Sequence, residues 1–436
     1  MKKQLLLTTL LILFLIIENI FSQAATPYEI GKWQGFRSCA ISYTFDDNES
    51  NQLAIAVPMF NNYGYKLTLF TVIDWFPNWL GLQNAADQGH EIASHSVFHP
   101  DLDVWDAKQT LELQNSQTEI NNHIKGHQCL TFAYPFCAKG VSSFVSQYYV
   151  AARGCQGYVE PSTPADFYNI SSLVCGAVGP INSIEAFNVT ANNTALKGGW
   201  CIYMIHALDS EGGYSPLSSA ILRASLDYLT DDRKYWVSTF SNVARYIKER
   251  NASNISETVN PDNNIKVSVT NDLDVFLYTI PISIRRLLPD GWTTCSVKQK
   301  NEILPSRIVE INSIKYIMFD VVPNNGDITL IKNGTTKIEN DFHGSVPIEY
   351  RLDQNYPNPF NPSTVISYQL ANSSHVSIKV FDVFGKEIAT LVNDYQQAGI
   401  HSSKFSIFNS QLSSGIYFYR LSTGNFVSTK KMLLIK

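Results

Sequence analysis

The strongest constraint on the fold is an alternation of strand-type and helix-type segments over roughly residues 28–251. Short apolar runs typical of buried strands are separated by stretches with helical periodicity. Such alternation predicts a parallel sheet with helices packed outside it, and we expect that sheet to close into a barrel. The expected strands are 39–45, 66–72, 131–134, 149–153 and 200–206, and the expected helices are 51–63, 104–124 and 241–250.

The chain beyond this region has a different pattern. Residues 251–264 are polar and rich in Asn, Ser and Pro, which is typical of a linker. After them helical periodicity stops, and alternating apolar runs are separated by turn signals. We expect an accessory β-sandwich over 262–335 and a second small β-sandwich over 348–436. The predicted fold is therefore α/β, with a (β/α) barrel over 28–252 followed by two small all-β sandwich domains.

The N-terminus has the pattern of a signal peptide. Lys2 and Lys3 precede an apolar run over 5–17, and small residues follow it up to Ala25. A membrane anchor is the alternative, but the run is shorter than the roughly 20 apolar residues that a spanning helix needs. We expect residues 1–24 to be a signal peptide, and we expect no transmembrane anchor in the mature chain.

Charge and cysteine usage limit the partners. A net charge of -5 produces no field of the kind that gathers nucleic acid, so partners must be argued from sites. The seven cysteines of an exported chain are free to form disulfides, although an odd number leaves one unpaired in a monomer. None forms a CxxC pair, which argues against a cysteine-built zinc site. Buried thiols and one or two disulfides both remain open.

Two adjacent acids follow the first predicted barrel strand. Barrel active sites are built at the carboxyl ends of strands, which is where Asp46 and Asp47 stand. A helix N-cap would explain one of these carboxylates but not both. Side by side, they would repel each other unless a cation compensated their charge. The pair therefore indicates either a cap or a cation site.

Histidines follow two further strands. His95 comes directly after a short expected strand, and His99 lies four residues later. In a helical or turn-like segment such a pair shares one face and can bind one metal ion, whereas an isolated pair is more often structural. Two imidazoles with one carboxylate form a ligand set that leaves a coordination position open for water. His206 ends another strand, where a lone histidine is usually a hydrogen-bonded core residue.

Taken together, these motifs resemble the polysaccharide deacetylases (NodB-homology, carbohydrate esterase family 4). The matching stretches, in the family's order, are Thr44-Phe45-Asp46-Asp47, His95-Ser96-Val97-Phe98-His99 and Met204-Ile205-His206. The resemblance covers about residues 30–250. It implies a distorted (β/α) barrel that holds one divalent metal, usually zinc.

The resemblance also implies individual roles. Asp47, His95 and His99 would hold the metal. Asp46 would be the general base, and His206 the general acid that protonates the departing amine or alkoxide.

A third family motif falls at residues 132–136. There the backbone N–H of Phe136 would stabilise the oxyanion, and Tyr134 is grouped with it as an oxyanion or substrate contact. The family commonly has Arg where this chain has Ala133. We hypothesise that Arg153, at the end of the next strand, takes over that role, steadied by Asp166; a surface salt bridge is the alternative for Arg153.

An aromatic residue in another loop is a candidate sugar contact. Trp75 follows the second strand and could stack on a sugar ring, although loop packing explains it equally well.

The last segment resembles the type IX secretion C-terminal sorting domain. The opening Tyr356-Pro357-Asn358-Pro359-Phe360-Asn361-Pro362 and the terminal Lys430-Lys431-Met432 carry the resemblance, with the strands at 380–385 and 415–419. It implies handling by the type IX machinery, followed by release or attachment at the outer surface. One more adhesive β-sandwich is the alternative.

The expected function is that of a secreted, metal-dependent hydrolase that removes acetyl groups from an extracellular polysaccharide through a metal-activated water. The polymer would be an N-acetyl amino-sugar polymer or O-acetyl xylan. One alternative is a hydrolase of the same fold that cuts a non-carbohydrate C–N amide bond. Another is a carbohydrate-binding module with a decayed active site, which Ala133 suggests and the intact acids and histidines oppose.

Overall fold

The structure is a computed structural model. Its description covers residues 27–101, 107–230, 234–262, 264–300, 302–332, 350–352, 354–355, 358–370, 374–396, 399–407, 412–424 and 426–435. The expected signal peptide lies outside these residues. The chain divides between Asn333 and Gly334 into two compact units.

A curved parallel sheet forms the centre of the first unit. Its strands follow the order β6-β5-β4-β3-β2-β8-β7, and β9 also pairs with β2. These strands are β2 (Cys39–Asp46), β3 (Thr68–Thr71), β4 (Glu91–Ser94), β5 (Thr131–Ala133), β6 (Ala151–Arg153), β7 (Leu173–Val174), β8 (Trp200–Ile205) and β9 (Tyr235–Val237). Every residue of β2 is buried, as expected for a strand covered on both faces. The predicted distorted (β/α) barrel is confirmed.

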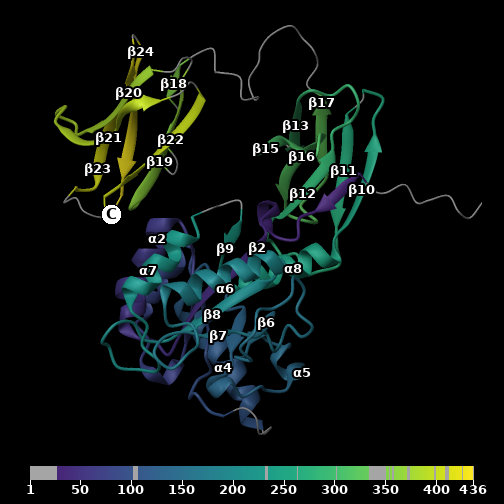
Figure 1. Cartoon of the computed structure of the whole chain (residues 1–436), viewed down its shortest axis with the longest axis vertical. Coiled ribbons are helices and arrows are strands. Elements are labelled where there is room, and N and C mark those ends of the chain that lie inside the picture. Colours follow the sequence, from purple (N-terminus) through teal and green to yellow (C-terminus); the bar gives the residue numbers. More distant parts are fainter. Residues whose placement is uncertain are drawn as a thin grey trace, which may run out of the picture. The chain divides into compact units, whose positions relative to one another are not determined.

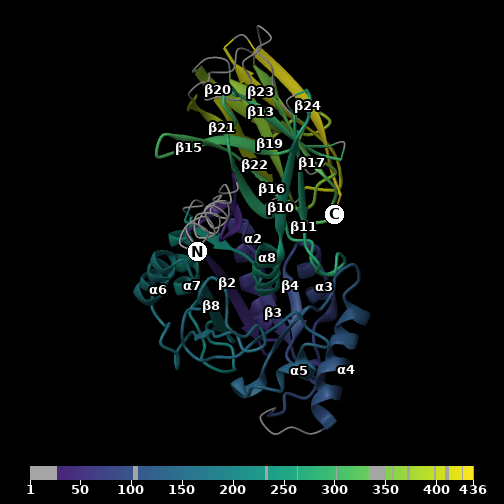
Figure 2. The ribbon, with the colours of Figure 1, turned by 90° about the vertical axis from the view of Figure 1, so that its right-hand side faces the viewer.

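Helices cover the outside of this sheet. They are α2 (Val57–Tyr63), α3 (Trp79–Asp87), α4 (Ala107–His123), α5 (Ser142–Val145), α6 (Ile184–Lys197), α7 (Ser219–Tyr228) and α8 (Phe240–Ala252), and a π-helical turn over Gln52–Ala56 leads into α2. Figure 2 shows strands β8, β2, β3 and β4 in the middle, with α6 on one side and α4 on the other. Local sequence sets the helix ends: the Ser183 side chain caps α6, and Gly198 ends it in a left-handed conformation.

The expected linker is instead a strand. Residues Asn254–Val259 form β10, which pairs antiparallel with β11 (Ile265–Thr270). β10 lies at the edge of its sheet, and its residues are mostly exposed or half-buried. An edge strand tolerates polar residues because one side faces water, so composition alone made it look like a linker.

Two antiparallel sheets follow, and they pack onto the barrel. One sheet has the order β1-β12-β16-β15 and the other β10-β11-β17-β13-β14. The strands are β1 (Tyr28–Ile30), β12 (Ile282–Leu287), β13 (Cys295–Gln299), β14 (Glu302–Leu304), β15 (Ser306–Ile311), β16 (Ile314–Val321) and β17 (Ile328–Lys332). Helix α8 lies between the barrel and these sheets (Figure 1), and its Tyr246 and Ile247 join one apolar cluster with Trp200 and Ile284. The expected accessory sandwich therefore shares a core with the barrel.

The second unit is all-β, as predicted. Its sheets have the orders β18-β19-β22 and β21-β20-β23-β24. The strands are β18 (Arg351–Leu352), β19 (Ser363–Leu370), β20 (Ser374–Phe381), β21 (Glu387–Gln396), β22 (Gly399–Ser406), β23 (Gly415–Thr423) and β24 (Phe426–Leu434). Alternate residues of β20 and β23, such as Val380 and Tyr419, are fully buried between the sheets. Within the described part of the chain, no helix has the length and apolar character to cross a membrane.

Candidate active site

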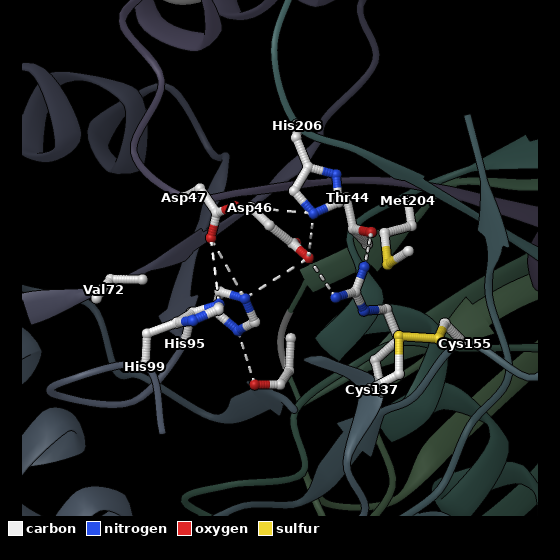
Figure 3. Close-up of polar contacts among 12 residues, drawn as sticks. Thr44, Asp46, Asp47, Val72, His95, His99, Cys137, Cys155, Met204 and His206 are labelled. Carbon is white, nitrogen blue, oxygen red and sulfur yellow. Dashed lines mark hydrogen bonds and ion pairs between the residues drawn. A yellow bond between two sulfur atoms is a disulfide. The ribbon is translucent and has the colours of Figure 1, made fainter. Parts of the chain in front are cut away.

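The candidate residues meet at the carboxyl ends of the parallel strands, as Figure 3 shows. Asp46 ends β2 and Asp47 follows it, His95 follows β4, and His206 follows β8. β2 pairs with both β3 and β8, so these strand ends lie along one edge of the sheet. Asp47 and His99 adopt left-handed backbone conformations with φ of 77° and 56°. Such conformations are costly for residues other than glycine and tend to occur at functional sites.

Three potential metal ligands converge in this group. One donor atom each from Asp47, His95 and His99 lies within 4.8 Å of the others. Asp47 Oδ1 is 3.5 Å from His95 Nε2 and 3.6 Å from His99 Nε2. Ligands bound at about 2.1 Å in a tetrahedral zinc site stand roughly 3.4 Å apart. The spacing therefore fits ligands around one small cation.

The protonation of His95 explains why this spacing needs a cation. His95 Nδ1 lies 2.8 Å from the backbone oxygen of Ala133, and a carbonyl can only accept. Nδ1 must therefore carry the proton, which leaves a lone pair on Nε2 facing Asp47. Asp47 Oδ1 is buried and has no hydrogen-bond partner among the described residues. When Asp47 is ionised, its lone pair and that of His95 face each other without a shared proton, and a metal ion completes such a donor set.

Burial shapes the ionisation of these groups in the metal-free chain. Burial raises the pKa of Asp47 to about 7, and repulsion from Asp46 and Glu49 adds to the increase. Burial also lowers the pKa of His95 to about 3 and holds the pKa of His99 below its usual value. Both imidazoles are therefore neutral at pH 7, which is the state that binds metals.

Arg153 keeps the second carboxylate charged. Its Nη2 donates a hydrogen bond of 2.5 Å to Asp46 Oδ2, and its Nη1 donates one of 3.1 Å to Thr44 Oγ1. Burial alone would raise the pKa of Asp46, but the Arg153 charge, together with His95 and His206, lowers it below its usual value. Arg153 is 1% exposed, so it makes no surface salt bridge.

His206 lies on the other side of the carboxylates. Its Nε2 is 3.8 Å from Asp46 Oδ2 and 3.8 Å from Asp47 Oδ2. Burial lowers its pKa below the usual value, although the Asp46 charge opposes the shift. Its Nδ1 is buried without a hydrogen-bond partner among the described residues.

The other expected site residues fall into two groups. The rings of Phe136 and Trp75 lie 4.6 Å and 4.9 Å from the His99 ring, so both line the site. Tyr134 is buried, and its hydroxyl donates to the backbone oxygen of Tyr168. This bond ties Tyr134 into the loop packing beside the site, and its contact with a substrate stays a prediction.

Asp166 does not meet Arg153. It pairs with Lys139 at 2.9 Å on the surface, and Arg153 Nε has no hydrogen-bond partner among the described residues. The expectation that Asp166 steadies Arg153 was therefore wrong. The position of an acid in the sequence does not predict the conformation of its loop, and therefore does not predict where its side chain points.

Several neighbours of the site were missed in the sequence. Glu112 on α4 accepts hydrogen bonds from the backbone of Val97 and Phe98, between the two histidines of the pair. The Tyr214 ring stands edge-on to His206 at 4.9 Å. A glutamate within a helical pattern and a tyrosine in a loop carry no local signal for such contacts.

A disulfide lies next to the site. Cys137 and Cys155 are joined, while Cys39, Cys129, Cys175, Cys201 and Cys295 are free. The cysteine spacing could not distinguish this pairing from others.

Comparison with known proteins agrees with this description. Residues 36–147 match the family described as "Polysaccharide deacetylase", and residues 354–436 match the "Secretion system C-terminal sorting domain". The chain therefore carries a domain of the polysaccharide deacetylase family and a sorting domain of the type IX secretion system. The sorting domain indicates a secreted or outer-surface protein.

Similarity to individual proteins is more distant. A gellan lyase from Bacillus sp is 27% identical over 355 residues, which span 74% of this chain and 14% of that protein. The Xyl-CE4 domain of a multidomain xylanase from the hindgut metagenome of Trinervitermes trinervoides is 20% identical, with a TM-score of 0.35 over 47% of this chain and 89% of that chain. A family 4 acetyl xylan esterase from Clostridium thermocellum, solved with a cobalt ion, is 18% identical. Its TM-score is 0.34 over 47% of this chain and 89% of that chain.

Proposed function

We propose that this chain is a secreted, metal-dependent deacetylase acting on an acetylated extracellular polysaccharide. One observation carries the proposal: donor atoms of Asp47, His95 and His99 converge beside a second buried carboxylate, Asp46, that an arginine keeps charged. A ligand set of two imidazoles and one carboxylate is that of a catalytic metal site.

The donor set fits a divalent metal, with zinc as the first choice. Imidazole nitrogens with one carboxylate oxygen suit zinc, whereas magnesium and calcium prefer sites built from oxygen alone. The unpartnered Asp47 Oδ1 is the clearest sign of fit, because a buried charge without a partner is costly. When bound, the metal would supply Lewis acidity for polarising the acetyl carbonyl and activating water.

The protein groups would divide the proton transfers between them. Asp46, held ionised by Arg153, would accept the proton of the attacking water as general base. His206, across the site, would donate a proton to the departing amine or alkoxide. Arg153 would act as a positioning residue, because it contacts Asp46 and Thr44 rather than the reacting atoms. The N–H of Phe136 would help to stabilise the oxyanion.

Exposed aromatic side chains support a sugar substrate. Trp75 and Phe136 flank His99, while Tyr214 flanks His206, and these rings are 45%, 70% and 49% exposed. Exposed aromatics beside a polar site are suited to stacking on the apolar faces of sugar rings. Their presence on both sides of the site favours a polymer that continues past the acetylated unit.

Metal analysis with an acetate-release screen tests the proposal. The panel should contain chitin-type, peptidoglycan-type and acetyl-xylan substrates, so that N- and O-deacetylation are separated. Bound metal with acetate release supports the proposal. Stoichiometric metal without acetate on any of these substrates would favour hydrolysis of a non-carbohydrate amide. A chain that binds no metal would fit a decayed binding module.

A further inference from the structure

The disulfide joins the two segments that carry site residues from β5 and β6. Cys137 directly follows Phe136, and Cys155 stands two residues after Arg153. Figure 3 shows the Cys137–Cys155 bond to the right of His95 and His99. The other cysteines are free, and four of them are buried.

The segment on the Cys137 side has an unfavourable backbone. Phe136 and Cys137 are consecutive left-handed residues, with φ of 53° and 61°. Each such conformation is costly when the residue is not glycine, and persists only where surrounding structure enforces it. This turn places the Phe136 ring 4.6 Å from His99. A bond at Cys137 is suited to holding the turn in this conformation.

The segment on the Cys155 side begins in a short strand and continues as a loop. β6 has three residues, lies at the end of the sheet order, and pairs with β5. On its other side, Ala152 and Gly154 form backbone hydrogen bonds with Phe167 and Ile170. Cys155 lies just beyond these bonds, outside any helix or strand. From this strand Arg153 reaches across the barrel interior to Asp46.

From these observations we propose that the Cys137–Cys155 disulfide is a positioning element of the active site. It closes the active-site end of the β5–β6 pair, and so holds Phe136 and Arg153 in place together. Activity then depends on the oxidised state of this one pair, and the chain becomes fully active only where disulfides persist. This inference rests on the proposed function.

Reduction of the purified, metal-loaded protein tests the inference. A water-soluble phosphine breaks the S–S bond, each sulfur takes up a proton, and the phosphine becomes its oxide with oxygen from water. Both cysteines are half-buried, so the reagent has access to the bond. We expect kcat for acetate release to fall roughly 10- to 100-fold, the range that small misplacements of catalytic groups produce. Removal of the phosphine and reoxidation by air should restore kcat.

The double variant Cys137→Ser with Cys155→Ser separates positioning from stability. Assayed well below its own Tm, it should show the same loss of kcat with unchanged metal stoichiometry, and the phosphine should have no further effect on it. Cys295→Ser, which changes a half-buried free cysteine of the β-sandwich, is the matched control and should keep both full activity and the response to the phosphine.

Two results would overturn the inference, and they differ from failure of the proposed function. If the reduced protein and the folded double variant keep kcat within twofold of the oxidised protein, the disulfide does not position the site. If the double variant loses metal in parallel with activity, the bond supports the fold rather than Phe136 and Arg153. An oxidised, metal-loaded protein that releases no acetate contradicts the proposed function itself.

Discussion

Arg153 donates a hydrogen bond to Asp46 inside the barrel, although the two residues are 107 positions apart in the chain. Arg153 comes from the edge strand β6 and Asp46 from β2. Strands β5, β4 and β3 lie between them in the sheet. Asp46 Oδ2 receives this bond, while Asp46 Oδ1 has no protein partner among the described residues. One oxygen of the carboxylate is therefore held by Arg153, and the other faces the site without a protein partner.

Replacing Arg153 by alanine should damage both activity and stability. Asp46 would remain buried without its cation, and breaking a buried pair typically costs about 3–5 kcal/mol. We expect kcat to fall by on the order of 100-fold and the free energy of unfolding to decrease, as measured by acetate release and urea unfolding. Arg153→Lys keeps the charge but cannot make both hydrogen bonds, to Asp46 and to Thr44, in the same geometry. It should therefore recover stability more than kcat. Unchanged turnover and an unchanged pH profile in Arg153→Ala would refute the positioning role.

Asp46 and His95 should separate catalysis from metal binding. Asp46→Asn keeps the ligand set but removes the base, so we expect full metal content and a loss of kcat of roughly 10²- to 10⁴-fold. His95→Ala removes a ligand, so we expect loss of the metal with loss of activity. Metal content by elemental analysis and acetate release on the same samples provide the measurement. Retained turnover in Asp46→Asn would show that Asp46 is not the base.

Glu112 should affect metal affinity without touching a ligand. Its carboxylate accepts the N–H groups of Val97 and Phe98, so it holds the turn that presents His99. Outer contacts of this kind are worth roughly 10- to 100-fold in metal affinity, and we expect Glu112→Ala to weaken zinc binding by that factor. Competition with a chelator measures the affinity. Glu119→Ala, a more exposed glutamate on the same helix, is the control, and equal effects of both changes would contradict the assignment.

His90 should make the stability of the barrel sensitive to acid. Burial lowers its pKa from 6.5 to about 3, and nearby Lys66 adds to the shift. Its Nδ1 accepts the backbone N–H of Leu67 at 3.1 Å. Because the folded-state pKa is depressed, the stabilising contribution is complete above pH 6.5 and is lost as the pH falls towards 3.

Urea unfolding at several pH values between 7 and 4 measures this contribution. As the pH falls, the free energy of unfolding of the wild type should decrease by up to about 1.4 kcal/mol per pH unit more than that of His90→Asn. The amide oxygen of this variant can still accept the Leu67 N–H. Identical slopes for wild type and His90→Asn would mean that His90 is protonated without cost in the folded chain.

The barrel and the residues at its strand ends follow from local sequence patterns. Alternation of strand and helix patterns is local, and parallel strands necessarily bring their carboxyl ends to one edge of a sheet. Asp46, Asp47, His95 and His206 could therefore be placed together before any coordinates were known. The polar edge strand β10 was mistaken for a linker because solvent exposure, rather than local pattern, explains its composition.

The contacts that loops and the edge strand make with this group depend on long-range packing. The contact of Arg153 with Asp46, the support of the histidine turn by Glu112 and the pairing of Cys137 with Cys155 each join residues through the curvature of the sheet and the path of a loop. The loop of Asp166 likewise determines its partner: Asp166 pairs with Lys139 and does not meet Arg153. Local patterns specify where an element ends, whereas the direction of a side chain across the barrel depends on packing among many distant residues at once.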